Sequence, residues 1–159
     1  MVYRVRGDVM AKELTGQGVV SEIATRLRAR FTTRQFKEVY KDKPIQGMVL
    51  PCIFIESVNT VSTSQIGRYA MWDHSVDIRC HPPKMRNDIQ TWARGIAVVV
   101  LETVSRIQVS GQQVKATRME WRVVDDVLHV IARYSYRVLQ TGDVLPDMQT
   151  LTYGQKIKE

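Results

Sequence analysis

The sequence predicts an α+β domain in which a mostly antiparallel sheet carries two amphipathic helices, in the order helix, three strands, helix and two further strands. Two segments place apolar residues at helical spacing, and several others alternate apolar and polar residues with the period of a strand. Strands joined by short links favour antiparallel pairing. Both helices are therefore expected to pack on one face of the sheet, as a two-layer domain.

The length and composition fit one folded domain. The chain has 159 residues, of which 44% are hydrophobic and 25% charged, values that exclude general disorder, a collagen-like repeat and a disulfide scaffold. Residues 1–17 are expected to form an N-terminal extension with a helical turn near 9–14, and residues 18–159 a single domain. We find no linker and no repeat.

The first helix and the first two strands follow from spacing. Val20, Ile23, Ala24, Leu27 and Phe31 share one helical face, which predicts a helix over 19–31. Strands are expected over 35–41 and 50–58. Consecutive apolar residues at 52–55 indicate that the second strand is covered on both faces. The polar segment 59–67 is expected to be a loop.

The second half is equally patterned. Apolar residues and one histidine alternate with polar residues over 69–80, which predicts a third strand. A wide apolar stripe predicts a helix over 86–107. Alternation over 112–124 and 127–139, with Asp125-Asp126 between, predicts a hairpin. Residues 148–153 are a candidate edge strand.

The cysteines and the apolar segments indicate the cellular compartment of the protein. Cys52 and Cys80 each lie in an apolar run, which favours buried, reduced thiols, with a disulfide between neighbouring strands as the alternative. The adjacent Cys80 and His81 are too few ligands for a structural zinc site. The N-terminus has no segment of signal-peptide character, and the run 96–101 is too short to cross a bilayer. We expect a cytosolic protein without membrane contact.

No catalytic constellation is found. The chain lacks a phosphate-binding glycine loop, a Gly-x-Ser-x-Gly elbow and a His-Glu-x-x-His helix. His74, His81 and His129 have structural explanations in strands or a turn. Asp73 and Asp77 share a strand face but lie about 13 Å apart, which is too far for a paired-carboxylate site. The sequence therefore predicts no enzyme, no metal and no cofactor.

The remaining signal is positive charge. The net charge is +7 and the isoelectric point about 9.6, which raises the question of nucleic-acid binding. Five cations fall within twelve positions, and two arginines lie in the N-terminal extension: Arg26, Arg28, Arg30, Arg34 and Lys37, with Arg4 and Arg6. They form either a phosphate-binding stripe or a solvated helix face. Aromatic residues are not interleaved with them, so base stacking is not indicated.

Several ordered motifs resemble one family. They are the helix 19–31, Val39-Tyr40, the strand motif Pro51-Cys52-Ile53-Phe54-Ile55, Gly67-Arg68-Tyr69 with Val76-Asp77-Ile78 and Pro82, the hairpin Val124-Asp125-Asp126-Val127-Leu128-His129, and Met148-Gln149-Thr150-Leu151. Together they resemble the phage tail terminator proteins of phages and prophage-like elements of Gram-positive bacteria. The resemblance covers about 19–152. The family usually has Asp-Gly at the turn and aromatic residues in place of Cys80-His81.

The resemblance implies a structural role in a tail that is either contractile or flexible, in an infectious phage or a bacteriocin-like particle. Such proteins form a ring, typically of six copies, that caps the head-proximal end of the tail tube after assembly in the host cytoplasm. Expected partners are further copies of the chain, the tube protein, the sheath protein and a neck or head completion protein, with DNA only in transit through the lumen.

The expected contact residues fall in two groups. Those proposed for the subunit or tube interface are Asn59, Thr60, Ser62, Ser64, Gln65, Arg68, Met148, Thr150 and Leu151. Those expected to face the lumen or a neighbouring ring are Arg4, Arg6, Arg26, Arg28 and Arg30. The alternatives are a solvent-exposed loop at 59–67, a basic nucleic-acid-binding module, and another ring protein of the head–tail joint.

Overall fold

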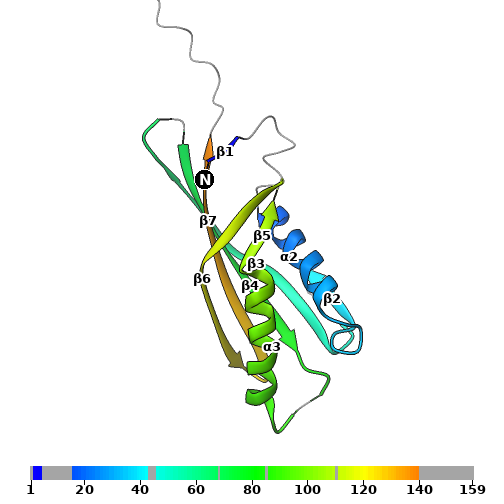
Figure 1. Ribbon diagram of the computed structural model, residues 1–159. Helices are drawn as coiled ribbons and strands as arrows, with labels where there is room; N and C mark the ends of the chain where they lie inside the picture. Colours follow the sequence, from blue (N-terminus) through cyan, green and yellow to red (C-terminus); the bar gives the residue numbers. More distant parts are fainter. Residues whose placement is uncertain are drawn as a thin grey trace, which may run out of the picture.

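Four strands of 13 residues each dominate the fold, shown as a computed structural model in Figure 1. The structure describes residues 2–4, 16–42, 46–67, 69–84, 86–109 and 111–139. Its elements are β1 (Val2–Arg4), α2 (Gly16–Arg30), β2 (Glu38–Lys41), β3 (Cys52–Ser64), β4 (Tyr69–His81), α3 (Ile89–Val104), β5 (Arg106–Val109), β6 (Gln112–Val124) and β7 (Val127–Leu139).

The strands form one sheet in the order β2-β3-β4-β7-β6-β5, and β1 pairs with β7 beside this path. Neighbours from β3 to β5 along the sheet are antiparallel, whereas β2 runs parallel to β3 and β1 parallel to β7. The α+β class is confirmed, but the sheet is mixed. Alternation has the same period in parallel and antiparallel strands, so the sequence pattern gave no direction for these short strands.

The closing hairpin has the predicted bounds. β6 and β7 are joined by Asp125 and Asp126, whose φ angles are 49° and 60°. Two central residues with positive φ match the twist of the flanking strands, and aspartate tolerates this conformation better than most residues. The turn therefore forms without a glycine at either central position.

Three expected boundaries were wrong. The segment 59–67 was expected to be a loop, but 59–64 continue β3 and pair with β4 up to Ser64 and Ala70. Residues 35–37 precede β2, and the helix expected over 86–107 spans only Ile89–Val104, followed by β5. A polar strand resembles a loop when neither face is buried in the core. The four-residue β5 is too short to show alternation beside a helix.

The core is one continuous cluster between the helices and the sheet. Val20, Ile23, Ala24 and Leu27 of α2 are fully buried, as the helical spacing predicted. α2 contacts β2, β3, β5 and α3, while α3 contacts β6 and β7. Arg28 ties the helix to the sheet edge, because its guanidinium donates to the carbonyl of Val39 at 2.7 Å.

β6 changes partners along its length. From Ala116 to Val124 it pairs with β7, and from Gln112 to Lys115 it pairs with β5, with an irregularity between Ala116 and Arg118. Bulges of this kind bend a strand and increase its twist. β1 pairs with Arg137–Leu139 of β7, where β6 has left. The two strands therefore diverge like a fork, which Figure 1 shows as β6 and β7 separating.

The two cysteines are free and buried. In the pairing of β3 with β4, Cys52 lies opposite His81, and Ile53 lies opposite Cys80. Because successive side chains point to opposite faces, the two thiols project from opposite faces of the sheet. The prediction of buried, reduced thiols is confirmed, and the alternative of a disulfide between them is wrong.

Candidate functional site

The β3–β4 hairpin carries most of the residues expected at the subunit interface. Four of them lie in the outer half of β3: Asn59, Thr60, Ser62 and Ser64. Gln65 lies at the turn, where its backbone N–H donates to the carbonyl of Tyr69 at 2.9 Å. From Val58 to Ser64 every residue is exposed. This hairpin is an ordered two-stranded arm rather than the loop that was expected.

Apolar side chains are exposed on the same arm. Val58 is 58% exposed, Val61 45%, and Ile66 at the turn 100%. Apolar residues are common on protein surfaces, but four along one hairpin, with Tyr69 as the fourth, are consistent with a contact surface. The sequence signal was weak, because isolated Val and Ile residues stand among Ser and Thr.

A buried histidine fixes the base of the arm. His74 is fully buried in β4; its Nδ1 lies 2.8 Å from the hydroxyl of Thr60 in β3, and its Nε2 lies 2.5 Å from the hydroxyl of Tyr136 in β7. The His74 and Tyr136 rings stack with centroids 5.3 Å apart. These contacts join three neighbouring strands, so the direction in which the arm leaves the domain is fixed by the core.

The outer edge of β3 is open along the arm. β2 pairs with β3 only from Cys52 to Ile55. From Glu56 to Ser64, β3 pairs with β4 on one side and with no other strand among the described residues. Backbone N–H and C=O groups on such an edge are able to accept a further strand.

Several expected contact residues lie outside the described part of the chain. Arg6, Arg68, Met148, Thr150 and Leu151 are among them, as are the helical turn near 9–14 and the edge strand at 148–153. Arg4 lies in β1, which pairs with β7.

The helix arginines are partly engaged within the domain. Arg26 bonds to Glu22 at 2.8 Å, and Arg28 donates to the carbonyl of Val39. Arg30 is exposed and lines, with Arg26 and Glu102, a shallow hollow between α2 and α3. The cluster seen in the sequence is therefore not a uniform stripe of free cations.

A second charged group lies on the sheet face that points away from the core. Arg79 bonds to Glu56 of β3 at 2.5 Å and to Asp77 at 3.0 Å, and His129 of β7 lies 3.0 Å from Asp77. Asp73, which shares the face with Asp77, accepts a hydrogen bond from Ser135. The two carboxylates are thus held in separate pairs, as their spacing predicted.

Burial and neighbouring charge shift three pKa values at this end of the sheet. Burial, together with the charges of Arg79 and His129, lowers the pKa of His81. Burial raises the pKa of both Cys52 and Cys80. Thiols with raised pKa values are poor nucleophiles at neutral pH, so neither cysteine has the environment of a reactive residue.

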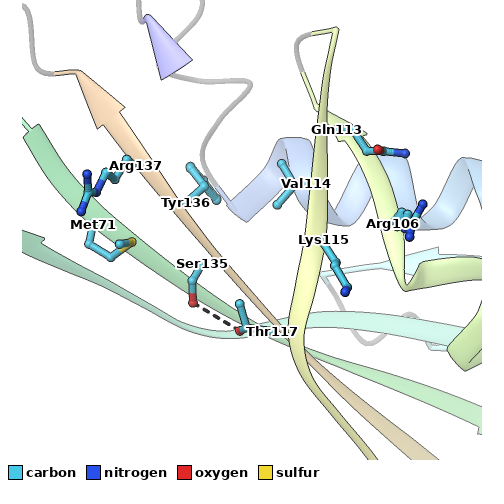
Figure 2. Close-up of a pocket in the computed structure, with 9 residues that line it drawn as sticks. All are labelled: Met71, Arg106, Gln113, Val114, Lys115, Thr117, Ser135, Tyr136 and Arg137. Carbon is cyan, nitrogen blue, oxygen red and sulfur yellow. Dashed lines mark hydrogen bonds between the residues drawn. The ribbon is translucent and has the colours of Figure 1, made fainter. Parts of the chain in front are cut away.

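A hollow of about 720 Å³ lies in the fork between β6 and β7. Figure 2 shows Arg137 and Met71 on one side, Lys115 and Arg106 on the other, and the hydroxyls of Thr117 and Ser135 bonded across its floor. Three of the lining residues described are cationic and none is acidic. These cations were missed in the sequence because they lie on three different strands.

Two further properties concern the described residues only. They contain no group of three or more His, Cys, Asp or Glu side chains placed to hold a metal ion. Neither described helix has the length and apolar character needed to span a lipid bilayer.

Comparison with known proteins identifies the family. A family model described as phage tail terminator protein matches residues 19–145. The chain belongs to this family. Phage tail terminator proteins are viral structural proteins of the phage tail, and the match includes most of α2, all of α3 and the strands from β2 to β7.

Solved structures are more distant. One chain from the virion of a native gene transfer agent particle is 13% identical with a TM-score of 0.45, and the alignment covers 80% of this chain and 90% of that one. A second solved chain, which carries no functional description, is 11% identical with a TM-score of 0.38, over 81% of this chain and 99% of that one. No curated protein matches this chain significantly.

Proposed function

We propose that the protein is a ring-forming tail terminator that caps the head-proximal end of a phage or phage-like tail tube, stops tube polymerisation and forms the joint to the neck. The single observation that carries the proposal is membership of the tail terminator family over residues 19–145. Its location would be the virion tail, after assembly in the host cytoplasm. We propose a structural role without catalysis.

The β3–β4 arm supports this proposal because it combines two features of an assembly contact. Val58, Val61 and Ile66 expose apolar area, and the edge of β3 beyond Ile55 pairs with no second strand in the part of the chain that the structure describes. A neighbouring subunit or the last tube ring would cover both. Such head-to-tail contacts close into a ring when the rotation between copies divides a full turn.

The proposed interface residues on the arm have distinct tasks. Asn59, Ser62 and Ser64 are exposed and supply hydroxyl and amide groups for hydrogen bonds to the neighbour. Thr60 instead bonds to His74 and positions the arm. Gln65 closes the turn. Arg68, Met148, Thr150 and Leu151 remain proposed contacts with a subunit or the tube.

The proposed partners are further copies of the chain in a ring of six, the tube protein, and the sheath and neck proteins where the tail has them. DNA would pass through the lumen. The orientation of Arg4, Arg6, Arg26, Arg28 and Arg30 toward the lumen or a neighbouring ring remains a prediction; the internal contacts of Arg26 and Arg28 make Arg30 the most available of the three helix arginines.

The test combines oligomeric state with tube length. Light scattering and negative-stain microscopy of the purified protein should show rings, and adding the protein to polymerising tube protein should shorten the tubes and place density at one end. A monomer that neither shortens tubes nor appears at their ends would contradict the proposal.

A matched pair of variants distinguishes a specific role of the arm from the effect of adding a charge anywhere on the surface. Ile66→Asp places a charge at the tip of the arm and should abolish ring formation and tube capping. Val124→Asp makes the same change at the 42% exposed end of β6 and should leave both intact. Equal behaviour of the two variants would remove the arm from the proposed interface.

A further inference from the structure

The cations of β5, β6 and β7 lie on one face of the sheet. Side chains at even positions of β7, from Leu128 to Val138, are buried in the core, so His129, Arg133, Ser135 and Arg137 point to the opposite face. Six cations belong to this face, all exposed, and we call them the β6–β7 strip: Arg106, Lys115, Arg118, Arg122, Arg133 and Arg137.

The strip contains a like-charge pair at its centre. Arg118 of β6 lies directly opposite Arg133 of β7 in the strand pairing. Like charges in this position destabilise a sheet. Glu120 bonds to Arg118 at 3.2 Å, with both side chains largely exposed, which offsets the repulsion only weakly. The two arginines line a hollow of about 200 Å³ with Ser75, Glu120 and Ile131.

The strip differs from the charged group beside it. Arg79 is bonded to two carboxylates, Glu56 and Asp77, and needs no further anion. Among the described residues, the side chains of Arg122, Arg133 and Arg137 make no ion pair. The fork hollow adds Arg106 and Lys115 without an acidic residue among its described lining. The positive potential is therefore concentrated on β6 and β7.

The chemistry of the strip favours phosphate groups on an extended polymer. Arg133 and Arg137 are four residues apart on β7, so their Cα atoms lie about 13 Å apart along the strand. Arg118 and Arg122 have the same spacing on β6. The hydroxyls of Ser135 and Thr117 already donate to Asp73 and to the carbonyl of Arg133, so the guanidinium groups are the donors that remain for a ligand. Arginine guanidinium groups are typical donors to backbone phosphates.

An acidic protein fits this surface less well. Protein interfaces have a core of buried apolar or aromatic anchors. No large apolar side chain is exposed in the segments 115–122 of β6 and 133–137 of β7. Aromatic rings that would stack with single-stranded bases are likewise not exposed there, which favours a duplex.

We propose that the β6–β7 strip binds the phosphate backbone of duplex DNA without reading its sequence. The inference goes beyond tail capping, because it concerns a surface of the single chain and does not depend on ring formation. It also assigns DNA contact to cations contributed by three strands, whereas the candidate phosphate-binding stripe in the sequence was the group of α2 arginines.

The test is fluorescence anisotropy with a labelled random-sequence duplex over a series of salt concentrations. The triple variant Lys115→Gln/Arg133→Gln/Arg137→Gln is compared with Arg34→Gln/Lys37→Gln/Arg94→Gln, which removes the same charge from exposed positions outside β5, β6 and β7. Each phosphate contact contributes about 0.9 to the slope of log affinity against log salt, so the strip variant should lose about 2.7 of slope. The control variant should keep most of the wild-type slope.

Three outcomes would overturn the proposal. The first is the absence of duplex binding by the wild-type protein at low salt. The second is an equal loss in both triple variants, which would indicate a general effect of net charge. The third is displacement of the duplex by polyglutamate as effectively as by unlabelled duplex, which would indicate an acidic protein as the partner. Circular dichroism of both variants checks folding, and light scattering records ring formation separately.

Discussion

The hydroxyl of Tyr134 offers a sharp test of how the sheet holds α3. Tyr134 is fully buried in β7, and its hydroxyl donates to the carbonyl of Val104, the last residue of α3, at 2.7 Å. The last four carbonyls of a helix have no partner within the helix. Tyr134→Phe removes the donor and leaves this carbonyl without it, while keeping the ring and its packing.

The expected cost follows from the burial. Leaving a buried acceptor unsatisfied costs about 1–3 kcal/mol. Taking about 2 kcal/mol, and about 2–4 °C of Tm per kcal/mol for a domain of this size, the variant should melt about 4–8 °C lower than the wild type. Tyr69→Phe is the matched control: Tyr69 is 36% exposed, and the change should leave Tm nearly unaltered.

The pH dependence of stability provides a second, independent test. Burial raises the pKa of Tyr134 above its ordinary value. The unfolded chain then loses this proton near pH 10, before the folded chain does, so wild-type stability falls as pH rises above about 10. Tyr134→Phe has no hydroxyl to ionise and does not lose stability in this way. The difference in Tm between wild type and variant should therefore narrow above about pH 10.

Differential scanning calorimetry or circular dichroism melts at several pH values measure both effects. Equal melting of the wild type and Tyr134→Phe at neutral pH would refute the reasoning. So would an equally large loss in Tyr69→Phe, because the cost would then not depend on the buried bond to Val104.

Three further predictions concern the charged residues. Arg28→Met should lower the free energy of unfolding by about 1 kcal/mol in denaturant titrations, because it removes the bond to Val39, whereas Arg30→Met should change it little. His81→Gln should make Tm fall less steeply below about pH 6.5, because the lowered pKa of His81 means that the unfolded chain takes up its proton first; an unchanged profile would contradict this. Arg133→Gln should raise stability by about 0.2–1 kcal/mol by removing the like-charge pair with Arg118, and loss of stability instead would show that the pair is not repulsive.

The predictable parts of the fold are those where one face of an element is buried and the other is not. The hairpin of β6 and β7 was found with its exact bounds, and so was the buried face of α2, because their alternation and helical spacing are uninterrupted. The outer half of β3 was missed, since Asn59, Ser62 and Ser64 project from the core and are held by pairing with β4. Pairing with a distant strand leaves no local signal.

Prediction of the candidate surfaces from the sequence is limited for the same reason. Arg26, Arg28 and Arg30 stood out because they are close in sequence, yet two of them make contacts within the domain. The cations of the β6–β7 strip are spread over more than 30 positions and meet only because β5, β6 and β7 are neighbours in the sheet. Their convergence depends on strand order, which residue spacing does not encode.

The irregularity between Ser57 and Asn59 has a consequence for the behaviour of the chain before assembly. An open strand edge with Val58, Val61 and Thr63 is a template for uncontrolled aggregation at high concentration. A bulge at its base twists the edge and leaves only the short run 59–64 beyond it, which hinders flat stacking of many copies. We therefore expect the bulge to limit association of newly made chains, while the edge beyond it remains able to pair during assembly.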